Sequence, residues 1–505
     1  MHILLNFLIW QAKLGTIKQQ SIISTIYIYI GVVIGFVSTG ILMPRFLSEE
    51  QNGIIKLLVS YSMIFAQFAS LGFQVATIRF FPYFKDKEKG HNGFFPLLTL
   101  VGILGFGLFI VVYYLIKGPI VDYESDKNSA FANYFFLILP LTFFFLYFNL
   151  FDIYARVLLK STVGTFLKEL FQRLLILGAI LLYVFEIIGF RQFTISYVAF
   201  LSLPTVILFF YLIYKGEIFI KPDFSFLNSS LVKSMTSLSI YGVFIGFSQI
   251  AISQIDSILI NFFKDTAHTG IYAITFYYGT LVILPSRAVF RIAPSFIAEA
   301  FKKDDMDQIR NIQFKSCLNQ LLVGTGIFLL LWLNIDNVFI ILPKEYIAGK
   351  YVILFIGLAN LISMAGGMSS QIITNSKYYK YNGLFVIIYL GLAVLLNIIF
   401  IPGLGIKGAA LAAMVSVLVF NFLQFIFIYR KFEIQPYKQS HLRIIFIGVI
   451  SYIITALFTY PDYLILNILL KSSLFSFLFI VLNYLSGTSQ DFNEMVEKYI
   501  PFLRK

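Results

Sequence analysis

Charged residues and cysteine are scarce in this chain, and each scarcity excludes a class of protein. Only 12% of the 505 residues are charged while 59% are hydrophobic, so a soluble fold would lack the polar surface needed to cover its apolar residues. Cys317 is the only cysteine, which excludes an intramolecular disulfide framework and a cysteine-rich metal site. The four histidines are scattered and form no metal-binding motif. We therefore expect neither a metal nor a cofactor.

Long apolar runs are abundant, and they set the fold class. A helix needs about 20 apolar residues to cross a bilayer. Runs of this kind, separated by charged or Pro/Gly-containing breaks, predict an all-α polytopic membrane protein with fourteen transmembrane helices. The expected ranges are 22–42, 54–73, 94–116, 131–151, 166–187, 193–214, 238–262, 270–292, 316–335, 351–373, 383–400, 407–428, 442–458 and 463–485.

The distribution of basic residues supports this number of helices and gives their orientation in the membrane. With the N-terminus in the cytoplasm, 26 of the 38 Lys and Arg fall on the cytoplasmic side and 8 on the outer side. This agrees with the positive-inside rule and places both termini in the cytoplasm. The net charge of +13 then reflects topology and attraction to anionic lipid, so we expect no nucleic-acid partner. Residues 1–21 lack the features of a cleaved signal peptide and are expected to form an interfacial segment.

An internal repeat organises the helices. The stretch "LMPRFLSEEQNGIIKLLVSYSMI" from Leu42 aligns without gaps to "LINFFKDTAHTGIYAITFYYGTL" from Leu259, and both restart a helix at Gly-Ile, Gly53 and Gly270. The two copies occupy the first hairpin of each six-helix block in the same orientation, which predicts a parallel repeat around a central cavity. The expected divisions are an N-lobe at 22–214, a linker at 215–234, a C-lobe at 235–430, a helix pair at 442–485 and a cytoplasmic tail at 486–505.

Arg287 and Arg291 are the first candidate site residues. They lie four residues apart, hence on one helix face, between Pro285 and Pro294. Arginine suits bidentate contacts with phosphate, so both are candidates for a cationic patch on the cavity wall. The alternative is snorkelling to the inner head groups, which we favour for Arg291, whereas we favour the cavity for the deeper Arg287.

Asp256 is the second intramembrane charge that needs an explanation. It lies inside an apolar helix with Gln254 and Gln249 nearby. An ionised Asp there costs about 2.5–3.5 kcal/mol on insertion scales. The three residues are candidates for a cavity wall that binds H⁺, Na⁺ or a sugar hydroxyl; a structural ion pair or interhelical hydrogen bond is an equally good interpretation.

Several further residues have expected local roles. Pro140 and Pro204 are predicted mid-helix hinges, together with Pro285 and Pro294 at the arginine pair. Lys168, Glu169 and Arg173 open the fifth span, and Asp152 and Arg156 close the fourth. We expect these charges to form local ion pairs at the cytoplasmic rim rather than to contact substrate.

The plan of six, six and two helices, together with "QIDSILINFFKDTAHTGIYAITFYYGTLV", resembles one family. These features are similar to the polysaccharide-lipid flippases (Wzx-type, O-antigen transporters) of the multidrug/oligosaccharidyl-lipid/polysaccharide exporter superfamily, whose pattern of a late Asp followed by Gly-Ile-Tyr is matched by Asp256 and Gly270-Ile271-Tyr272. The resemblance implies export of a polyprenyl-diphosphate-linked oligosaccharide across a bacterial inner membrane. Expected partners are this lipid, the bilayer, and polysaccharide polymerase or assembly proteins.

Two other classes stay open at this stage. A cation-coupled multidrug antiporter of the same superfamily is the main alternative, although it favours twelve spans and an acidic cavity. A membrane enzyme is disfavoured because the outer loops are short. No Walker A sequence is present, so transport would draw on an ion gradient, the membrane potential or substrate flux. The sequence leaves the sugar and the choice between H⁺ and Na⁺ coupling open.

Overall fold

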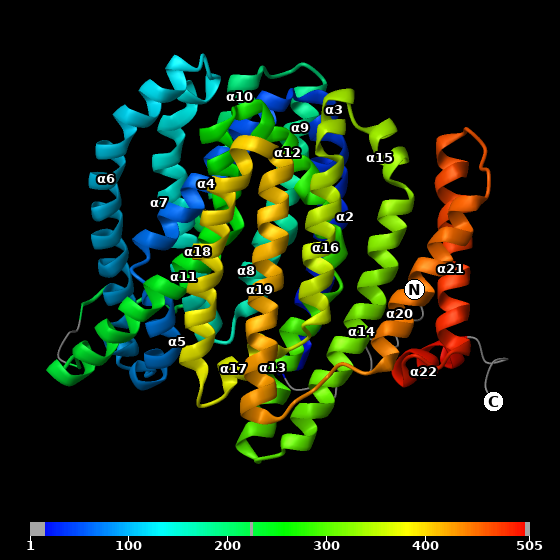
Figure 1. Cartoon of the computed structure of the whole chain (residues 1–505). Coiled ribbons are helices and arrows are strands. Elements are labelled where there is room, and N and C mark those ends of the chain that lie inside the picture. Colours follow the sequence, from blue (N-terminus) through cyan, green and yellow to red (C-terminus); the bar gives the residue numbers. More distant parts are fainter. Residues whose placement is uncertain (1–15, 223–225, 500–505) are drawn as a thin grey trace. The chain divides into compact units, whose positions relative to one another are not determined.

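A computed structural model describes residues 16–222 and 226–499, with side chains from residue 23 onward. Every regular element in these ranges is a helix (Figure 1), which confirms the predicted all-α class. Twelve helices are long and apolar enough to cross a membrane, and a bent pair of helices makes a thirteenth span. The broken segment 161–184 covers the predicted fifth span, which is consistent with about fourteen spans. The predicted interfacial segment falls largely on residues 1–15, outside the described residues.

The chain forms two compact units, the first ending at Gly270. The elements of this first unit are α2 (Thr16–Gly35), η2 (Phe36–Leu42), α3 (Met43–Phe46), α4 (Glu49–Ala69), α5 (Phe73–Phe84), η3 (Gly90–Gly93), α6 (Phe94–Asp126), η4 (Ala130–Leu137), α7 (Ile138–Val157), α8 (Ser161–Phe166), η5 (Leu167–Phe171), α9 (Gln172–Val184), α10 (Phe190–Tyr214), α11 (Ser229–Phe263) and the start of α12 (Thr266–Thr280). Of these, η2 and η5 are π-helical turns, which interrupt the regular α-helical register.

The second unit begins at Ile271. After the rest of α12, its elements are η6 (Leu281–Ile283), α13 (Ser286–Lys302), α14 (Met306–Leu333), α15 (Ile335–Ile341), η7 (Lys344–Gly349), α16 (Lys350–Ala365), α17 (Ser369–Asn375), α18 (Tyr379–Leu404), α19 (Ile406–Phe432), α20 (Gln439–Leu457), α21 (Leu464–Leu485) and α22 (Gln490–Tyr499).

The division between the units follows α11, whereas the repeat placed the lobe boundary in the linker before it. Small residues explain why α11 packs so closely in the first unit. Gly72 has φ +66° and lies against the α11 backbone at Ser239, and a Cβ atom on Gly242 would lie 2.7 Å from the Gly72 carbonyl oxygen. Only glycine permits this approach. The grouping of α11 with the later helices as one lobe stays a prediction.

The two glycines that marked the internal repeat contact each other's helices. A side chain on Gly53 would collide with the Thr266 carbonyl, and one on Gly270 with the Glu49 carbonyl. The start of α4 is fixed by a capping box, in which the Ser48 hydroxyl accepts from the Gln51 amide and the Gln51 side chain accepts from the Ser48 amide. Glycine is therefore required at both repeat positions for α4 and α12 to cross at their N-terminal ends.

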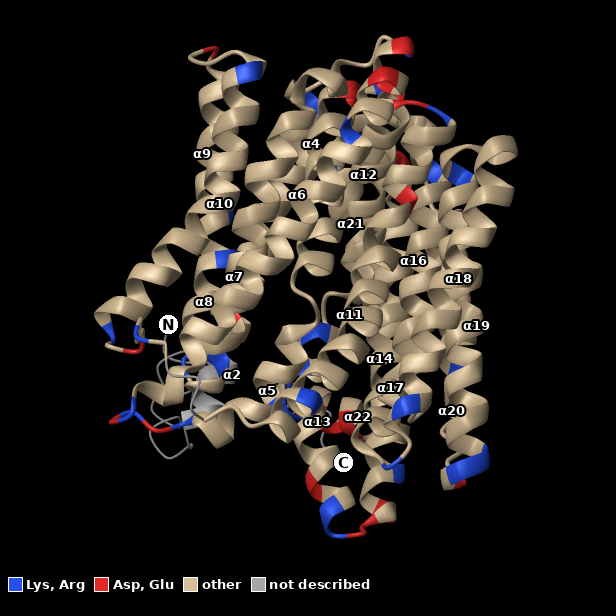
Figure 2. Cartoon of the chain, turned by 90° about the vertical axis from the view of Figure 1, so that its left-hand side faces the viewer, with Lys and Arg blue, Asp and Glu red and all other residues tan. Residues whose placement is uncertain are grey.

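Charged residues are concentrated at helix ends, as Figure 2 shows, and the helix middles are almost free of them. This pattern is expected for spans whose middles lie in hydrocarbon. In the second unit, α20 and α21 lie side by side (Figure 1). α20 packs against α14. Hydrogen bonds tie α21 to the α14–α15 junction, from Asn334 to Ser472 (3.2 Å) and from Asn337 to Asn467 (3.0 Å). The predicted C-terminal helix pair thus packs on the second unit.

The prolines lie in different settings from one another. The helix pair around Pro285 bends by 50°, in agreement with the predicted kink. Pro204 lies inside α10 and Pro294 inside α13. Pro140 lies just after the junction of η4 and α7, inside the continuous span Ala130–Val157, as predicted. It has no N–H to donate to the helical turn before it. Hinge roles for all four stay predictions.

Candidate functional site

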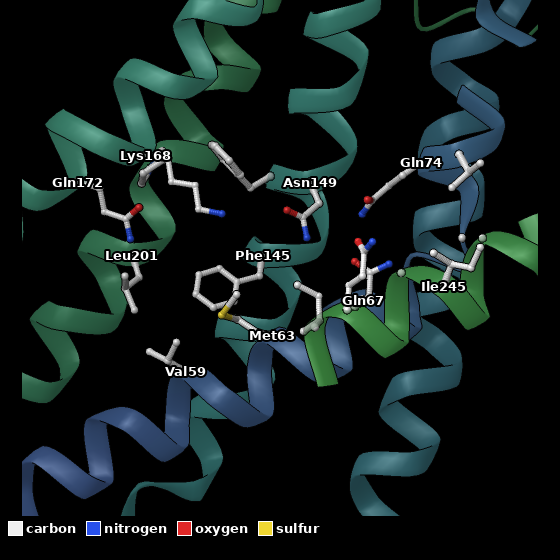
Figure 3. Close-up of a pocket in the computed structure, with 18 residues that line it drawn as sticks. Val59, Met63, Gln67, Gln74, Phe145, Asn149, Lys168, Gln172, Leu201 and Ile245 are labelled. Carbon is white, nitrogen blue, oxygen red and sulfur yellow. The ribbon is translucent and has the colours of Figure 1, made fainter. Parts of the chain in front are cut away.

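A cavity of about 450 Å³ lies within the first unit (Figure 3). This volume is within the usual range of ligand pockets. Residues from α4, α5, α7, η5, α9, α10 and α11 surround it. They are Val59, Met63, Gln67, Gly72, Gln74, Val75, Phe145, Phe148, Asn149, Lys168, Gln172, Leu201, Pro204, Gly242, Ile245, Gly246, Gln249 and Ile250.

Amide side chains supply most of the polarity of this cavity. Each of five elements contributes one: Gln67, Gln74, Asn149, Gln172 and Gln249. An amide both donates and accepts, as a sugar hydroxyl does, so several amides can replace the water around a saccharide. The Gln74 Nε2 atom is buried and has no hydrogen-bond partner in the described chain. An unused buried donor of this kind gains from a ligand acceptor.

Lys168 is the charged residue of the cavity lining, and no carboxylate is among the described residues that line it. Its side chain extends into the cavity (Figure 3), and its amine lies 5.5 Å from the centroid of the Phe148 ring. The π-helical turn η5 carries Lys168, and π-turns often occur at functional sites. The expectation that Lys168 forms an ion pair at the rim is therefore wrong.

The other charges around Lys168 behave as the sequence predicted. The Arg173 guanidinium contacts the Glu169 carboxylate (2.8 Å), and Arg156 contacts Asp152 (2.6 Å). Arg173 also donates to the Gly31 carbonyl (2.8 Å), which ties α9 to α2. A sequence signal for Lys168 did exist, because Lys168 and Gln172 are four residues apart and so share one helix face. The helix face that carries Lys168 and Gln172 lines the cavity. The face that carries Glu169 and Arg173 packs on α2.

The three α11 candidates separate into one cavity residue and two buried ones. Gln249 lines the cavity. Gln254 does not, because its side-chain oxygen accepts from Lys56 Nζ (2.9 Å) and Ser60 Oγ (2.9 Å), which joins α11 to α4. Asp256 is 6% exposed and interacts electrostatically with Lys56. A role for Asp256 in binding H⁺ or Na⁺ stays a hypothesis.

Arg287 and Arg291 lie in the second unit, on α13 after the 50° bend. Arg287 is exposed and Arg291 is partly buried. Apolar residues of the same helix, including Ile297, pack into a core cluster with α17 and α19. The structure does not bring the arginines together with Gln249 in one unit, so their place in a cavity stays a prediction.

A second charged cluster in the first unit centres on Glu217, just after α10. Its carboxylate contacts Lys160 Nζ (2.6 Å), His91 Nε2 (3.3 Å) and Lys87 Nζ (3.4 Å). The Tyr154 hydroxyl donates to the Glu217 carbonyl (2.9 Å). Burial raises the pKa of Glu217, but hydrogen bonds from Lys160 and His91 and the charges of Lys160 and Lys87 outweigh burial and hold that pKa below its usual range. The cluster joins three loops at one end of the unit.

The turn that presents His91 is strained. Gly90, His91, Asn92 and Gly93 all lie in the left-handed region, with φ between 46° and 69°. This region is unfavourable for His91 and Asn92, which have a Cβ atom. The Asn92 side chain donates to the Phe84 carbonyl (3.0 Å) and holds the turn, and His91 packs between Phe81 and Phe219. Within the described residues, neither this cluster nor any other has the three His, Cys or carboxylate groups of a metal site.

Comparison with known proteins identifies the family. The family model described as polysaccharide biosynthesis protein matches residues 17–297, more than half of the chain. The chain belongs to this polysaccharide biosynthesis protein family. No match to the curated proteins was found.

Solved structures show which fold this family member adopts. A lipid II flippase MurJ in an inward closed conformation superposes with a TM-score of 0.71 over 92% of this chain and 99% of that chain, at 12% identity. An inward-facing multidrug resistance MATE transporter of the MOP superfamily reaches 0.60 over 82% and 98%, at 13% identity. A MOP superfamily transporter from Pyrococcus furiosus reaches 0.56 over 84% and 97%, at 14% identity. The chain thus has the MOP-superfamily fold, which both flippases and multidrug transporters use.

Proposed function

We propose that the protein is an alternating-access flippase that moves a polyprenyl-diphosphate-linked oligosaccharide from the inner to the outer leaflet of a bacterial inner membrane, for assembly of cell-surface polysaccharide or lipopolysaccharide. Membership of the polysaccharide biosynthesis family supports this proposal. The observation that carries it is the chemistry of the first-unit cavity, whose polar lining consists of five amides and one lysine.

The cavity chemistry fits a saccharide head group on an anionic lipid. Moving such a head group through hydrocarbon would strip water from many hydroxyls, each at a cost of several kcal/mol without a replacement. Amides on five elements supply that replacement, while the polyprenyl tail stays in the bilayer. The distribution of Lys and Arg assigns α13 to the cytoplasmic end of its span. In the proposed cycle, Arg287 and Arg291 on this helix add positive charge at that end.

A cation-coupled multidrug antiporter would have the same fold but different cavity chemistry. A site for cationic drugs needs carboxylates, because a buried positive charge requires an opposite charge. The described cavity lining contains Lys168 and no Asp or Glu. Asp256, which would be the natural cation site, lies on the helix whose Gln254 binds the Lys56 amine (2.9 Å). These charges favour the flippase.

The test is leaflet-resolved accumulation of polyprenyl-linked oligosaccharide in cells depleted of this protein. Wild type should clear a build-up on the cytoplasmic face, and Arg287→Ala should fail to do so while inserting normally in the membrane. Arg443→Ala is the matched control, because Arg443 is also exposed, on α20 of the same unit. Unchanged lipid distribution together with altered drug or dye efflux would contradict the flippase and support the antiporter.

A further inference from the structure

We infer that the first-unit cavity contains an anion-binding subsite centred on Lys168, which takes one carboxylate or phosphate group of the transported head group. The inference rests on the proposed function for the origin of the anion. The presence of the subsite rests on the charges around Lys168 alone.

The charge balance around Lys168 leaves one positive charge without a partner. Two carboxylates lie nearby in the chain, but each is bound by the arginine four residues after it, Glu169 by Arg173 (2.8 Å) and Asp152 by Arg156 (2.6 Å). Both carboxylates act on Lys168 electrostatically, and Arg156 opposes them, but neither lies within ion-pairing distance of its amine. The net charge that faces the cavity is that of the lysine.

The surroundings of the amine are suited to a ligand rather than to bulk water. Within the described chain Lys168 has neither a hydrogen-bond partner nor an ion-pair partner, and its amine lies 5.5 Å from the centroid of the Phe148 ring. Asn149 and Gln172 lie on either side of it in the cavity (Figure 3). An ammonium group in a protein-lined space is costly without an anion. A bound anion would receive one charge-assisted bond from Lys168 and amide hydrogen bonds from its neighbours.

Two parts of a lipid-linked saccharide carry such an anion. One is the diphosphate that joins sugar to lipid, and the other is the carboxylate of an acidic sugar. Lys168 lies seven residues after Ser161, where α8 begins, or about 10 Å along the helix at 1.5 Å per residue. Either group would pair with the Lys168 amine, so the experiment must separate them.

The experiment measures thermal unfolding of the purified full-length protein in detergent at constant ionic strength. The probes are sodium glucuronate, inorganic pyrophosphate and, as the neutral reference, glucose. We expect one of the two anions to raise the unfolding midpoint of the wild type more than glucose does. Lys168→Gln should weaken this binding about tenfold, as expected for loss of a charge-assisted contact, and Lys168→Arg should retain most of it.

Lys215→Gln is the matched control, because Lys215 also lies over an aromatic ring, at 5.2 Å from that of Tyr214, but outside the cavity. It should bind the anion as the wild type does. A response to glucuronate alone assigns the subsite to an acidic sugar, and a response to pyrophosphate alone assigns it to the diphosphate. No anion response in the wild type, or an equal response in Lys168→Gln, would overturn the inference. Neither result would contradict the proposed flippase function, which the assay in cells tests separately.

Discussion

Two lysines of the first unit lie eight residues apart and have opposite environments. Lys160 contacts the buried Glu217 carboxylate at 2.6 Å, in a cluster that also includes His91 and Lys87. Lys168 faces a cavity with no carboxylate within ion-pairing distance, and its closest charged neighbours in the chain are bound by arginines. The two lysines therefore differ in their counter-ion: Lys160 has a carboxylate partner and Lys168 has none among the described residues.

With the proposed subsite, this difference separates a structural charge from a ligand-binding one. Around Glu217 three basic groups surround one carboxylate, and the pKa of that carboxylate is held low despite burial, which shows that its charged form is stabilised in the fold. Around Lys168 the folded protein leaves the charge without such compensation. Stability should therefore depend on the Glu217 cluster, and ligand binding on Lys168.

The largest expected effect comes from Glu217→Gln. The change removes the negative charge while Lys160 and His91 remain partly buried, so we expect the free energy of unfolding to fall by about 3 kcal/mol, as for a broken buried ion pair. Thermal unfolding in detergent measures it. Lys168→Gln should change stability by less than about 1 kcal/mol, because no ion pair is lost. Equal losses of stability in Glu217→Gln and Lys168→Gln would contradict the distinction between a structural charge and a ligand-binding one.

The acid dependence of stability should come from the same carboxylate. Because its folded-state pKa lies below the ordinary value of 4.5, the stabilisation by Glu217 is complete above that value and declines as pH falls through the folded-state pKa. The difference in unfolding midpoint between wild type and Glu217→Gln should therefore be present at pH 5 and above and close below about pH 4. Lys168→Gln should follow the wild-type curve. A constant difference down to pH 3 would show that Glu217 is not the group responsible.

The sequence predicted the helices and two of the local ion pairs, because both depend on short-range patterns. Apolar runs identified the spans, and spacing of four identified Glu169 with Arg173 and Asp152 with Arg156, which the structure confirms. The Gly53 and Gly270 repeat marked a real contact between α4 and α12, although as a repeat it implied correspondence rather than contact.

The contents of the cavity could not be predicted in the same way. Gln254 and Gln249 look alike in sequence, yet one side chain binds Lys56 on α4 and the other lines the cavity. Lys168 was misassigned because the cavity that its side chain enters, and the π-turn that carries it, become visible only in three dimensions. The Glu217 cluster joins loops that are far apart in the chain, Lys87 and His91 to Lys160 and Glu217, and no spacing rule links them.

A moderate effect is expected from Arg156→Gln. The variant leaves the Asp152 carboxylate without its arginine, and the free negative charge then attracts the Lys168 amine at an effective dielectric constant near 20. Anion binding to the cavity should weaken about threefold to fivefold, although Arg156 does not line the cavity. Titration of the preferred anion, followed by the unfolding midpoint, measures this change. Unaltered affinity would mean that the arginines play no part in keeping Lys168 available, and would weaken the contrast with Lys160.

The smallest expected effect distinguishes the two glutamines of α11. Gln249→Leu removes one neutral hydrogen-bonding group from the cavity, so affinity for a lipid-linked saccharide should fall about threefold, the size of a single neutral hydrogen bond, with an unchanged unfolding midpoint. Gln254→Leu, five residues along the same helix, should lower the unfolding midpoint and leave the affinity unchanged. The reason is that it leaves Lys56 and Ser60 without their acceptor. Binding measured by titration and stability measured by unfolding should thus change in different variants. If Gln254→Leu weakened binding and left stability unchanged, the assignment of Gln254 to helix packing would be wrong, and the cavity would extend toward Asp256.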